Sequence, residues 1–307
     1  MTAVATQHWD AKILGALIQN GVKPAVLREA IFSNTTYASW AQEHPEHNGC
    51  EPVELPEPMW AIAITDDAYP SHLAQRQLSP PVVIYGIGNK DVLATPSIAV
   101  IGTRKMSQLG ASITKAAALG VKTCGATLIS GLADGCDQAA HVAAIELRAP
   151  TIAVIGCGID KHSNTTLIEA IVAHNGAVIS EHPIGTPSTP QRLMARNRII
   201  SGLSAGVVVA EAAKDSRGTI NAIGCAISEG VSVLVTKPKP AWSNHPGAQL
   251  ASILANPNGV DPDKFGWVGL ANKNCWKHAP LANAVATNRE ELIEYIGLML
   301  QFAPHGQ

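Results

Sequence analysis

The sequence has few charged and few aromatic side chains, no strong net charge and no long apolar run. Charged residues make up 15% and aromatic residues 4% of the 307 positions, and the formal net charge is -2. A chain this close to neutral does not coat nucleic acid by bulk charge, although it can still form a local basic groove. No apolar run reaches the ~20 residues of a membrane-spanning helix, and the N-terminus lacks a signal-peptide pattern. We therefore expect a cytoplasmic globular protein without a membrane partner.

The cysteines lack the spacing of a metal site or a redox pair. They are Cys50, Cys124, Cys136, Cys157, Cys225 and Cys275. None belongs to a C-x-x-C pair and several lie in apolar runs, which predicts reduced and mostly buried thiols. Asp137 and His141 stand four residues apart on an expected helix, a spacing that suits an acid–base pair or two metal ligands. We favour a helix cap at Asp137 and a loop contact by His141, and we predict no metal because no third ligand follows at regular spacing.

Two nucleotide-binding motifs are also missing. Gly156-Cys157-Gly158 does not continue into G-x-G-x-x-G, because Lys161 takes the place of the last glycine, and a Walker A loop is absent. The pair Gly86 and Gly88 follows a weak strand and precedes no clear helix. The sequence therefore predicts no nicotinamide or other cofactor.

From Ser97 onward, short apolar runs alternate with helical patterns. The runs cover residues 98–101, 127–129, 151–155, 177–179, 207–209 and 231–235. They are continuously apolar, which is typical of parallel strands covered on both faces. This alternation predicts an α/β fold with an extended, Rossmann-like, doubly wound and mostly parallel sheet. Weaker strand patterns lie upstream, at residues 60–64 and 82–85.

Three parts follow from this pattern. Residues 1–48 form a helical N-terminal segment and linker, with two short helices between Trp9 and Phe32. The polar stretch from Ser33 to Pro58 is expected to be linker. Residues 59–240 form the Rossmann-like domain. Residues 241–307 form a loop-rich C-terminal extension, with a terminal helix that starts near Thr287.

Glycines and polar residues gather where the expected strands end, which is where ligands bind in open α/β sheets. They are Gly102, Thr103 and Arg104, then Ser130 and Gly131, then Gly156 and Gly158, with Lys161 beyond. Glycine lets the backbone approach a ligand, and the arginine guanidinium can fork onto a phosphate. The competing interpretation is that these glycines only form tight turns, but their recurrence at consecutive strand ends favours an anion-binding surface.

Two further clusters favour phosphate binding. Arg196, Asn197 and Arg198 lie on a helix expected over residues 191–203, where they can hold phosphates while the apolar side packs on the sheet. A solvated face with surface ion pairs is the alternative. Ser216, Gly218 and Thr219 at the start of the next helix predict a phosphate nest, with helix capping by Ser216 or Thr219 as the alternative. All are proposed as phosphate contacts.

Together these motifs resemble the DNA-processing protein A (DprA, also called Smf) family, within the Rossmann-like DprA-LOG superfamily. The matching stretches are residues 69–70, 79–82, 99–104, 130–137, 140–141, 151–158, 180–181, 195–204 and 208–211. The resemblance implies sequence-independent binding of single-stranded DNA, a homodimer, and delivery of the strand to a RecA-type recombinase in transformation or recombination. It also implies that Arg104 is a principal DNA contact. The loop that carries Lys161 is shorter than in the family, and no winged-helix pattern follows Thr236.

A nucleotide-cleaving enzyme on the same fold is the alternative. LOG-type phosphoribohydrolases break the N-glycosidic bond, and Glu181, Arg196 and Glu211 would then act at the sugar. The sequence lacks the Pro-Gly-Gly-x-Gly-Thr-x-x-Glu pattern of those enzymes. We therefore expect a strand-binding protein without catalytic residues, although the few aromatic side chains limit base stacking.

Overall fold

The strands form one mixed sheet in the computed structural model, which describes residues 8–47, 49–52, 54–75, 78–237, 245–256, 258–265 and 282–303. They are β1 (Trp60–Ala63), β2 (Val83–Gly88), β3 (Ser97–Gly102), β4 (Thr127–Ser130), β5 (Thr151–Val154), β6 (Ala177–Ser180), β7 (Gly206–Glu211), β8 (Ser232–Thr236) and β9 (Ala284–Ala286). Their order across the sheet is β1-β2-β6-β5-β4-β3-β7-β8-β9. The ladders from β6 through β9 are parallel, and β1 and β2 add an antiparallel edge. The predicted mostly parallel α/β fold is confirmed.

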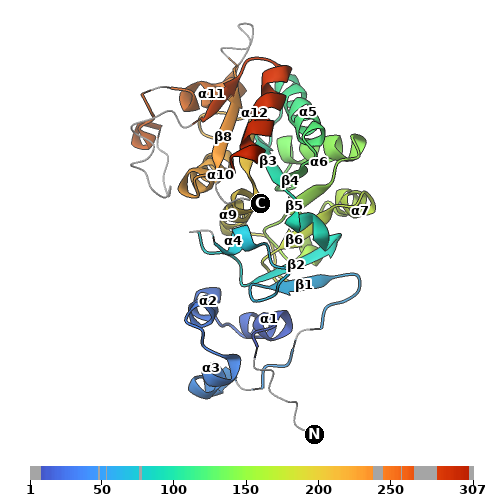
Figure 1. The fold of residues 1–307 in the computed structure, drawn as a ribbon, viewed down its shortest axis with the longest axis vertical. Helices are drawn as coiled ribbons and strands as arrows, with labels where there is room; N and C mark the ends of the chain where they lie inside the picture. The colour runs from blue at the N-terminus through green and yellow to red at the C-terminus, as the bar shows by residue number, and fades with distance from the viewer. Residues whose placement is uncertain are drawn as a thin grey trace.

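The helices cover both faces of this sheet (Figure 1). They are α1 (Ala11–Gln19), α2 (Pro24–Phe32), α3 (Tyr37–Glu43), α4 (Ser71–Ala74), α5 (Gln108–Thr123), α6 (Cys136–Glu146), α7 (Thr165–Ala173), α8 (Pro190–Ala195), α9 (Asn197–Leu203), α10 (Arg217–Ser228), α11 (Gln249–Leu254) and α12 (Arg289–Gln301). Short 3-10 helices span Pro45–His47, Lys90–Ala94, Ile159–Lys161, Pro246–Ala248 and Pro262–Phe265.

Alternate residues of the central strand β3 enter different cores. Ala99 and Ile101 pack in the cluster that holds α9, α10 and α11, whereas Ile98 and Val100 pack in the cluster that holds α5, α6 and α12. Burial of both faces explains why the run is apolar at every position. Since β3 has β4 on one side and β7 on the other, the chain reverses its direction of winding between β3 and β7.

The N-terminal helices share a core with the sheet. The two helices predicted between Trp9 and Phe32 are α1 and α2. The side chains of Trp9 and Leu14 belong to the same buried cluster as Tyr85 of β2. The segment from Ser33 to Pro58 is not simply linker, because it contains α3, whose Trp40 packs edge to face on Trp9 at a centroid distance of 5.7 Å. Helix α3 was not predicted because Trp40 is its single buried residue, and one apolar position in a polar stretch produces no helical periodicity.

Three other expectations on secondary structure need correction. The helix expected over residues 191–203 is two helices, α8 and α9, which meet at Arg196. The strand expected over 82–85 continues to Gly88, where Gly86 leaves room for the Trp60 ring: a Cβ there would lie 2.1 Å from it. The loop expected beyond Ala241 contains α11. Within the extension predicted over residues 241–307, positions 241–244, 257, 266–281 and 304–307 lie outside the described residues, and Cys275 is among them.

The cysteines and the helices bear on two further predictions. Cys50, Cys124, Cys136, Cys157 and Cys225 are free thiols. Within the described part of the chain, no helix combines the length and the apolar character needed to cross a bilayer.

Candidate functional site

A cavity of about 320 Å³ lies where the winding of the sheet reverses. It opens at the carboxyl end of β3, between the loop from Gly102 to Lys105, helices α8 and α9, and the start of α10. We call it the switch-point cavity. It brings together eight of the predicted site residues, namely Gly102, Thr103, Arg104, Arg196, Asn197, Ser216, Gly218 and Thr219. The reversal point of an open α/β sheet is where such folds bind ligands.

Exposed cations surround the mouth of this cavity. Arg104, Lys105 and Arg217, which we call the cationic rim, are exposed, and none forms an ion pair with another described residue. Sequence reasoning included Arg104 but missed Lys105 and Arg217 as contacts. Lys105 directly follows the strand-end motif, and Arg217 is the first residue of α10. The sequence could have identified both residues, because each is adjacent to a residue that was predicted to bind phosphate.

The start of α10 supplies unpaired backbone donors to the same mouth. Ser216 occupies the N-cap position, but its side chain makes no capping hydrogen bond. The first-turn N–H groups of Arg217, Gly218 and Thr219 have no acceptor among the described residues. An uncapped helix N-terminus attracts anions through these donors and the helix dipole. Capping by Ser216 is therefore not realised, and a phosphate nest remains open to a ligand.

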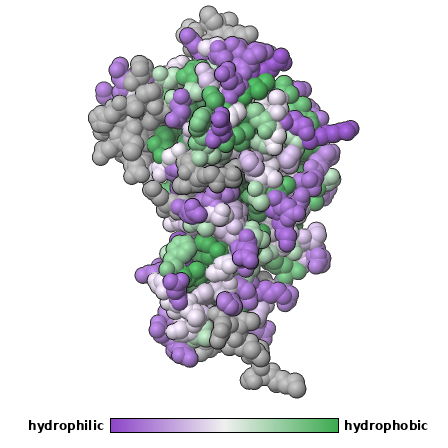
Figure 2. Space-filling model, viewed as in Figure 1, coloured by the Kyte–Doolittle hydropathy of each residue, from purple (hydrophilic) through white to green (hydrophobic). Residues whose placement is uncertain are grey.

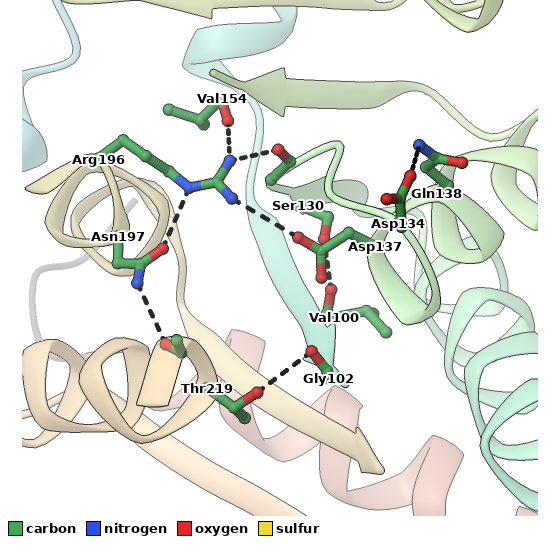
Figure 3. A network of polar contacts seen from close by, with 12 residues as sticks. Val100, Gly102, Ser130, Asp134, Asp137, Gln138, Val154, Arg196, Asn197 and Thr219 are labelled. Carbon is green, nitrogen blue, oxygen red and sulfur yellow. Dashed lines mark hydrogen bonds and ion pairs between the residues drawn. The ribbon is translucent and has the colours of Figure 1, made fainter. Parts of the chain in front are cut away.

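Two hydrogen bonds hold the start of α10 in place (Figure 3). The Thr219 hydroxyl donates to the Gly102 carbonyl at 3.1 Å, which ties α10 to the end of β3. The Asn197 amide donates to the Gly218 carbonyl at 3.2 Å, which ties α10 to α9. Thr219 and Asn197 are both buried, so their side chains position helix α10 and do not contact a ligand at the surface.

Arg196 is buried beneath the cavity, with 4% of its surface exposed. Its guanidinium donates to the carbonyls of Gly131 and Val154 and, at 3.1 Å, to the side-chain oxygen of Asn197. One nitrogen lies 3.8 Å from an Asp137 carboxylate oxygen (Figure 3). We expected Arg196 to face phosphates on an exposed helix, but its donors are directed at protein groups. The structure gives it a positioning role, because it joins α8 and α9 to the loops after β4 and β5.

The acid beside Arg196 is not half of an acid–base pair. Burial raises the pKa of Asp137, opposed by the charge of Arg196 and by hydrogen bonds from the Ala133 and Gly131 N–H groups. His141 instead bonds through Nδ1 to the Thr151 hydroxyl at 2.8 Å. Burial, and then the nearby Arg196 charge, lowers the pKa of His141 to about 3, so this imidazole is neutral. Among the described residues, no three His, Cys, Asp or Glu side chains gather as a metal site.

Arg198 faces away from the cavity and pairs with Glu181 at the end of β6. Two guanidinium nitrogens donate to the two carboxylate oxygens at 2.7 and 2.6 Å, and Nε donates to the Ser79 carbonyl at 2.9 Å. Burial alone would raise the pKa of Glu181, but the hydrogen bonds and charge of Arg198 lower it from its ordinary value of 4.5. The pair fastens α9 to the sheet and to the segment before β2, so the surface phosphate contact expected of Arg198 does not fit this geometry.

Replacing Glu181 with glutamine should lower the free energy of unfolding at neutral pH by about 2–4 kcal/mol, because Arg198 would keep a largely buried charge without a counter-ion. An acid whose pKa is lowered by folding stabilises the folded state above its unfolded pKa, and this stabilisation is lost as the pH falls through the folded value. The difference between wild type and Glu181→Gln should therefore shrink below pH 4.5. Urea unfolding at neutral pH and at a pH below 4.5 measures this difference in the free energy of unfolding. If the difference were the same at both pH values, the Glu181–Arg198 ion pair would not be its cause.

The glycines at the strand ends are required mainly by close packing inside the protein. A Cβ on Gly131 would lie 2.2 Å from the Arg196 guanidinium, and one on Gly102 would lie 2.5 Å from the Cys136 sulfur. A Cβ on Gly156 would lie 3.0 Å from the backbone of α8. At Gly218, by contrast, nothing lies within 4 Å. Close contact with protein atoms, which is neither ligand approach nor the tight turn given as the alternative, therefore accounts for Gly102, Gly131 and Gly156, whereas Gly218 is open.

The remaining predicted contacts lie away from the cavity. The Ser130 hydroxyl donates to the Val100 carbonyl at 2.6 Å and is buried. A Cβ on Gly158 would meet the carboxylate of Asp160, which also pairs with Lys161 at 3.3 Å. The loop that carries Lys161 therefore forms a separate, partly exposed surface beyond β5.

The residues proposed for an enzyme do not converge on the cavity. Glu181 pairs with Arg198 outside it. Arg196 lines it, but its donors are directed at the carbonyls of the protein. Glu211, at the end of β7, is 3% exposed and accepts a hydrogen bond from the Ser107 N–H at 2.8 Å, at the start of α5. The acid among the lining residues is Asp137, whose charge Arg196 offsets.

Comparisons with known proteins agree with this architecture. The family model described as DNA recombination-mediator protein A matches residues 60–254. The chain is 38% identical to the DNA processing protein DprA of Streptococcus pneumoniae over 176 residues, which cover 56% of this chain and 61% of that protein, less than two thirds of its length. It is 31% identical to the Protein Smf of Escherichia coli over 311 residues, which cover 96% of this chain and 79% of that protein.

Two solved structures share the fold. The X-ray structure of DNA processing protein A from S. pneumoniae superimposes with a TM-score of 0.57 and 28% identity, over 78% of this chain and 84% of that one. A structure of DNA processing protein A from Helicobacter pylori, whose subject is the single-stranded DNA binding mode of that protein, gives a TM-score of 0.58 over 78% of this chain and 95% of that one. At 21% identity, the second similarity shows the fold alone.

Proposed function

Because the chain belongs to the DNA recombination-mediator protein A family, we propose that it binds single-stranded DNA at the switch-point cavity and acts in DNA recombination or transformation. The observation that carries the proposal is the cationic rim of Arg104, Lys105 and Arg217 around the uncapped start of α10. Lysine and arginine side chains and helix N-termini contact phosphate and sugar atoms without reading sequence. These three exposed cations therefore lie where they can contact the phosphates of a bound strand.

The lining of the cavity also fits a strand that is not read base by base. Leu193 and Met194, both partly exposed, form an apolar wall beside the rim. Apolar side chains accept the face of any base, as aromatic platforms do in other strand-binding proteins. With an apolar wall and backbone donors, we expect binding with little sequence preference.

The binding assay that tests this proposal uses a fluorescent oligo-dT strand at low and at physiological salt. We expect binding that weakens steeply with salt, because each neutralised phosphate releases counter-ions. A nucleotide-hydrolysis assay runs in parallel. Absence of strand binding at low salt would refute the proposal, and release of a free base from a nucleotide would favour the enzyme instead.

A homodimer, a RecA-type recombinase partner and a cytoplasmic location also belong to this proposal. Leu298 of α12 and Phe302, the residue directly after this helix, have 41% and 72% of their surfaces exposed. Figure 2 shows apolar surface near this helix among hydrophilic side chains. A second copy that covered both side chains would gain from burying apolar area.

A further inference from the structure

The mouth of the switch-point cavity carries several anion-binding donors that have no acceptor among the described residues. The start of α10 presents the N–H groups of Arg217, Gly218 and Thr219 together with the uncommitted Ser216 hydroxyl. Arg104 lines the same mouth. An internal phosphodiester offers two free oxygens and one negative charge. A terminal phosphate monoester offers three strong acceptor oxygens and a charge near -2 at neutral pH.

The shape of the cavity also suits the end of a chain. Its deep lining residues Asp137, Arg196, Ile200 and Ala222 are all buried, whereas the rim is exposed. Arg196 and Asp137 contact each other among these buried lining residues, in the network that Figure 3 shows. An internal nucleotide brings chain on both of its sides past the exposed rim, whereas a terminal nucleotide has only one chain to accommodate.

We infer that the switch-point cavity recognises the terminal phosphate monoester of a nucleotide, either at one end of a DNA strand or on a free nucleoside monophosphate. This inference rests on the proposed function, since it names the part of the strand that the same cavity holds. The volume of about 320 Å³ is in the range of small-molecule sites, and the apolar wall gives the attached base a surface.

Three oligo-dT strands of one length test the inference: one with a 5′-phosphate, one with a 3′-phosphate and one with hydroxyl groups at both ends. A strand has a direction, so a built site should favour the phosphate at one end only. We expect one phosphorylated strand to bind about fivefold to tenfold more tightly than the hydroxyl strand, and the other to stay within about twofold. Bulk electrostatic attraction would raise both affinities equally.

A second arm places the effect in the cavity and identifies the source of the phosphate. Gly218→Asp should remove the advantage of the phosphorylated strand, whereas the uncharged Gly218→Asn should retain part of it. Titration with deoxythymidine monophosphate shows whether a free nucleotide also binds, with a dissociation constant of about 1 mM or tighter.

The outcomes separate this inference from the proposed function. Equal affinities for all three strands, an equal gain at both ends, or an advantage that survives Gly218→Asp would overturn terminal recognition while strand binding stands. Loss of binding for every strand would overturn both. A one-ended advantage with no binding of the free nucleotide assigns the cavity to strand ends. The same advantage with competition by the nucleotide assigns it to both sources.

Discussion

Replacing Arg196 with methionine should lower the free energy of unfolding by about 3–5 kcal/mol, the cost of removing one partner from a buried, hydrogen-bonded charge pair. The change leaves the carboxylate of Asp137 without its counter-ion in a buried site. It also leaves the carbonyls of Gly131 and Val154 without their guanidinium donors. Methionine fills a similar length but donates no hydrogen bond, so both effects occur at once. Urea unfolding followed by circular dichroism measures the change.

Arg192 provides the matched control on the neighbouring helix. Its guanidinium donates to the Pro187 carbonyl at 2.7 Å from a more exposed position. We expect Arg192→Ala to change the free energy of unfolding by no more than about 0.5–1 kcal/mol. If Arg196→Met cost no more than Arg192→Ala, the assignment of Arg196 to the framework would be wrong, and its guanidinium would be free to serve a ligand.

Substituting aspartate for Gly218 should weaken strand binding by about tenfold to a hundredfold without destabilising the protein. A carboxylate at this position places negative charge between the cationic rim and the first-turn N–H groups of α10. Nothing lies within 4 Å of the added Cβ, so the change causes no clash. Helix propensity and the helix dipole each favour aspartate over glycine in the first turn, by about 0.3–1 kcal/mol.

The opposite signs of these two effects make the test sharp. A decrease in strand affinity together with unchanged or higher thermal stability cannot come from misfolding. Gly218→Asn is the isosteric control, because it adds the same volume without the charge. If the aspartate and asparagine variants bound oligo-dT equally well, the start of α10 would not be part of the interface.

The sheet could be predicted from sequence because its strands are buried on both faces and stay apolar at each position. That signal is strong in β3, where Ile98 to Ile101 divide between two cores. It fails at α3, where a single buried Trp40 in a polar segment gives no helical repeat. The break between α8 and α9 was also missed. Residues 191–203 have an unbroken helical pattern, and the break falls at Arg196, whose side chain contacts two loops that are distant in the sequence.

The location of the site followed from topology, but the roles of its residues did not. Arg104 and the Ser216–Thr219 segment could be assigned to the mouth because both follow strands that end at the reversal point. Whether an arginine faces solvent or a carbonyl depends on tertiary contacts that spacing does not contain. Arg196 and Arg198 are two residues apart, and each turns toward a different acid. For the same reason, Gly131 was predicted to contact a ligand, whereas in the structure it leaves room for the Arg196 guanidinium.

The most direct test of strand binding at the switch-point cavity is the salt dependence of oligo-dT affinity, measured for wild type and for Arg104→Ala, Lys105→Ala and Arg217→Ala. For single strands, the slope of log affinity against log salt changes by about 0.7 for each phosphate that the protein no longer neutralises. We expect each substitution to weaken binding and to make the slope shallower by about this amount, while Lys115→Ala, on the exposed face of α5, leaves both unchanged. Slopes identical to wild type in all three rim variants would contradict binding at this cavity, because the strand would then be held elsewhere.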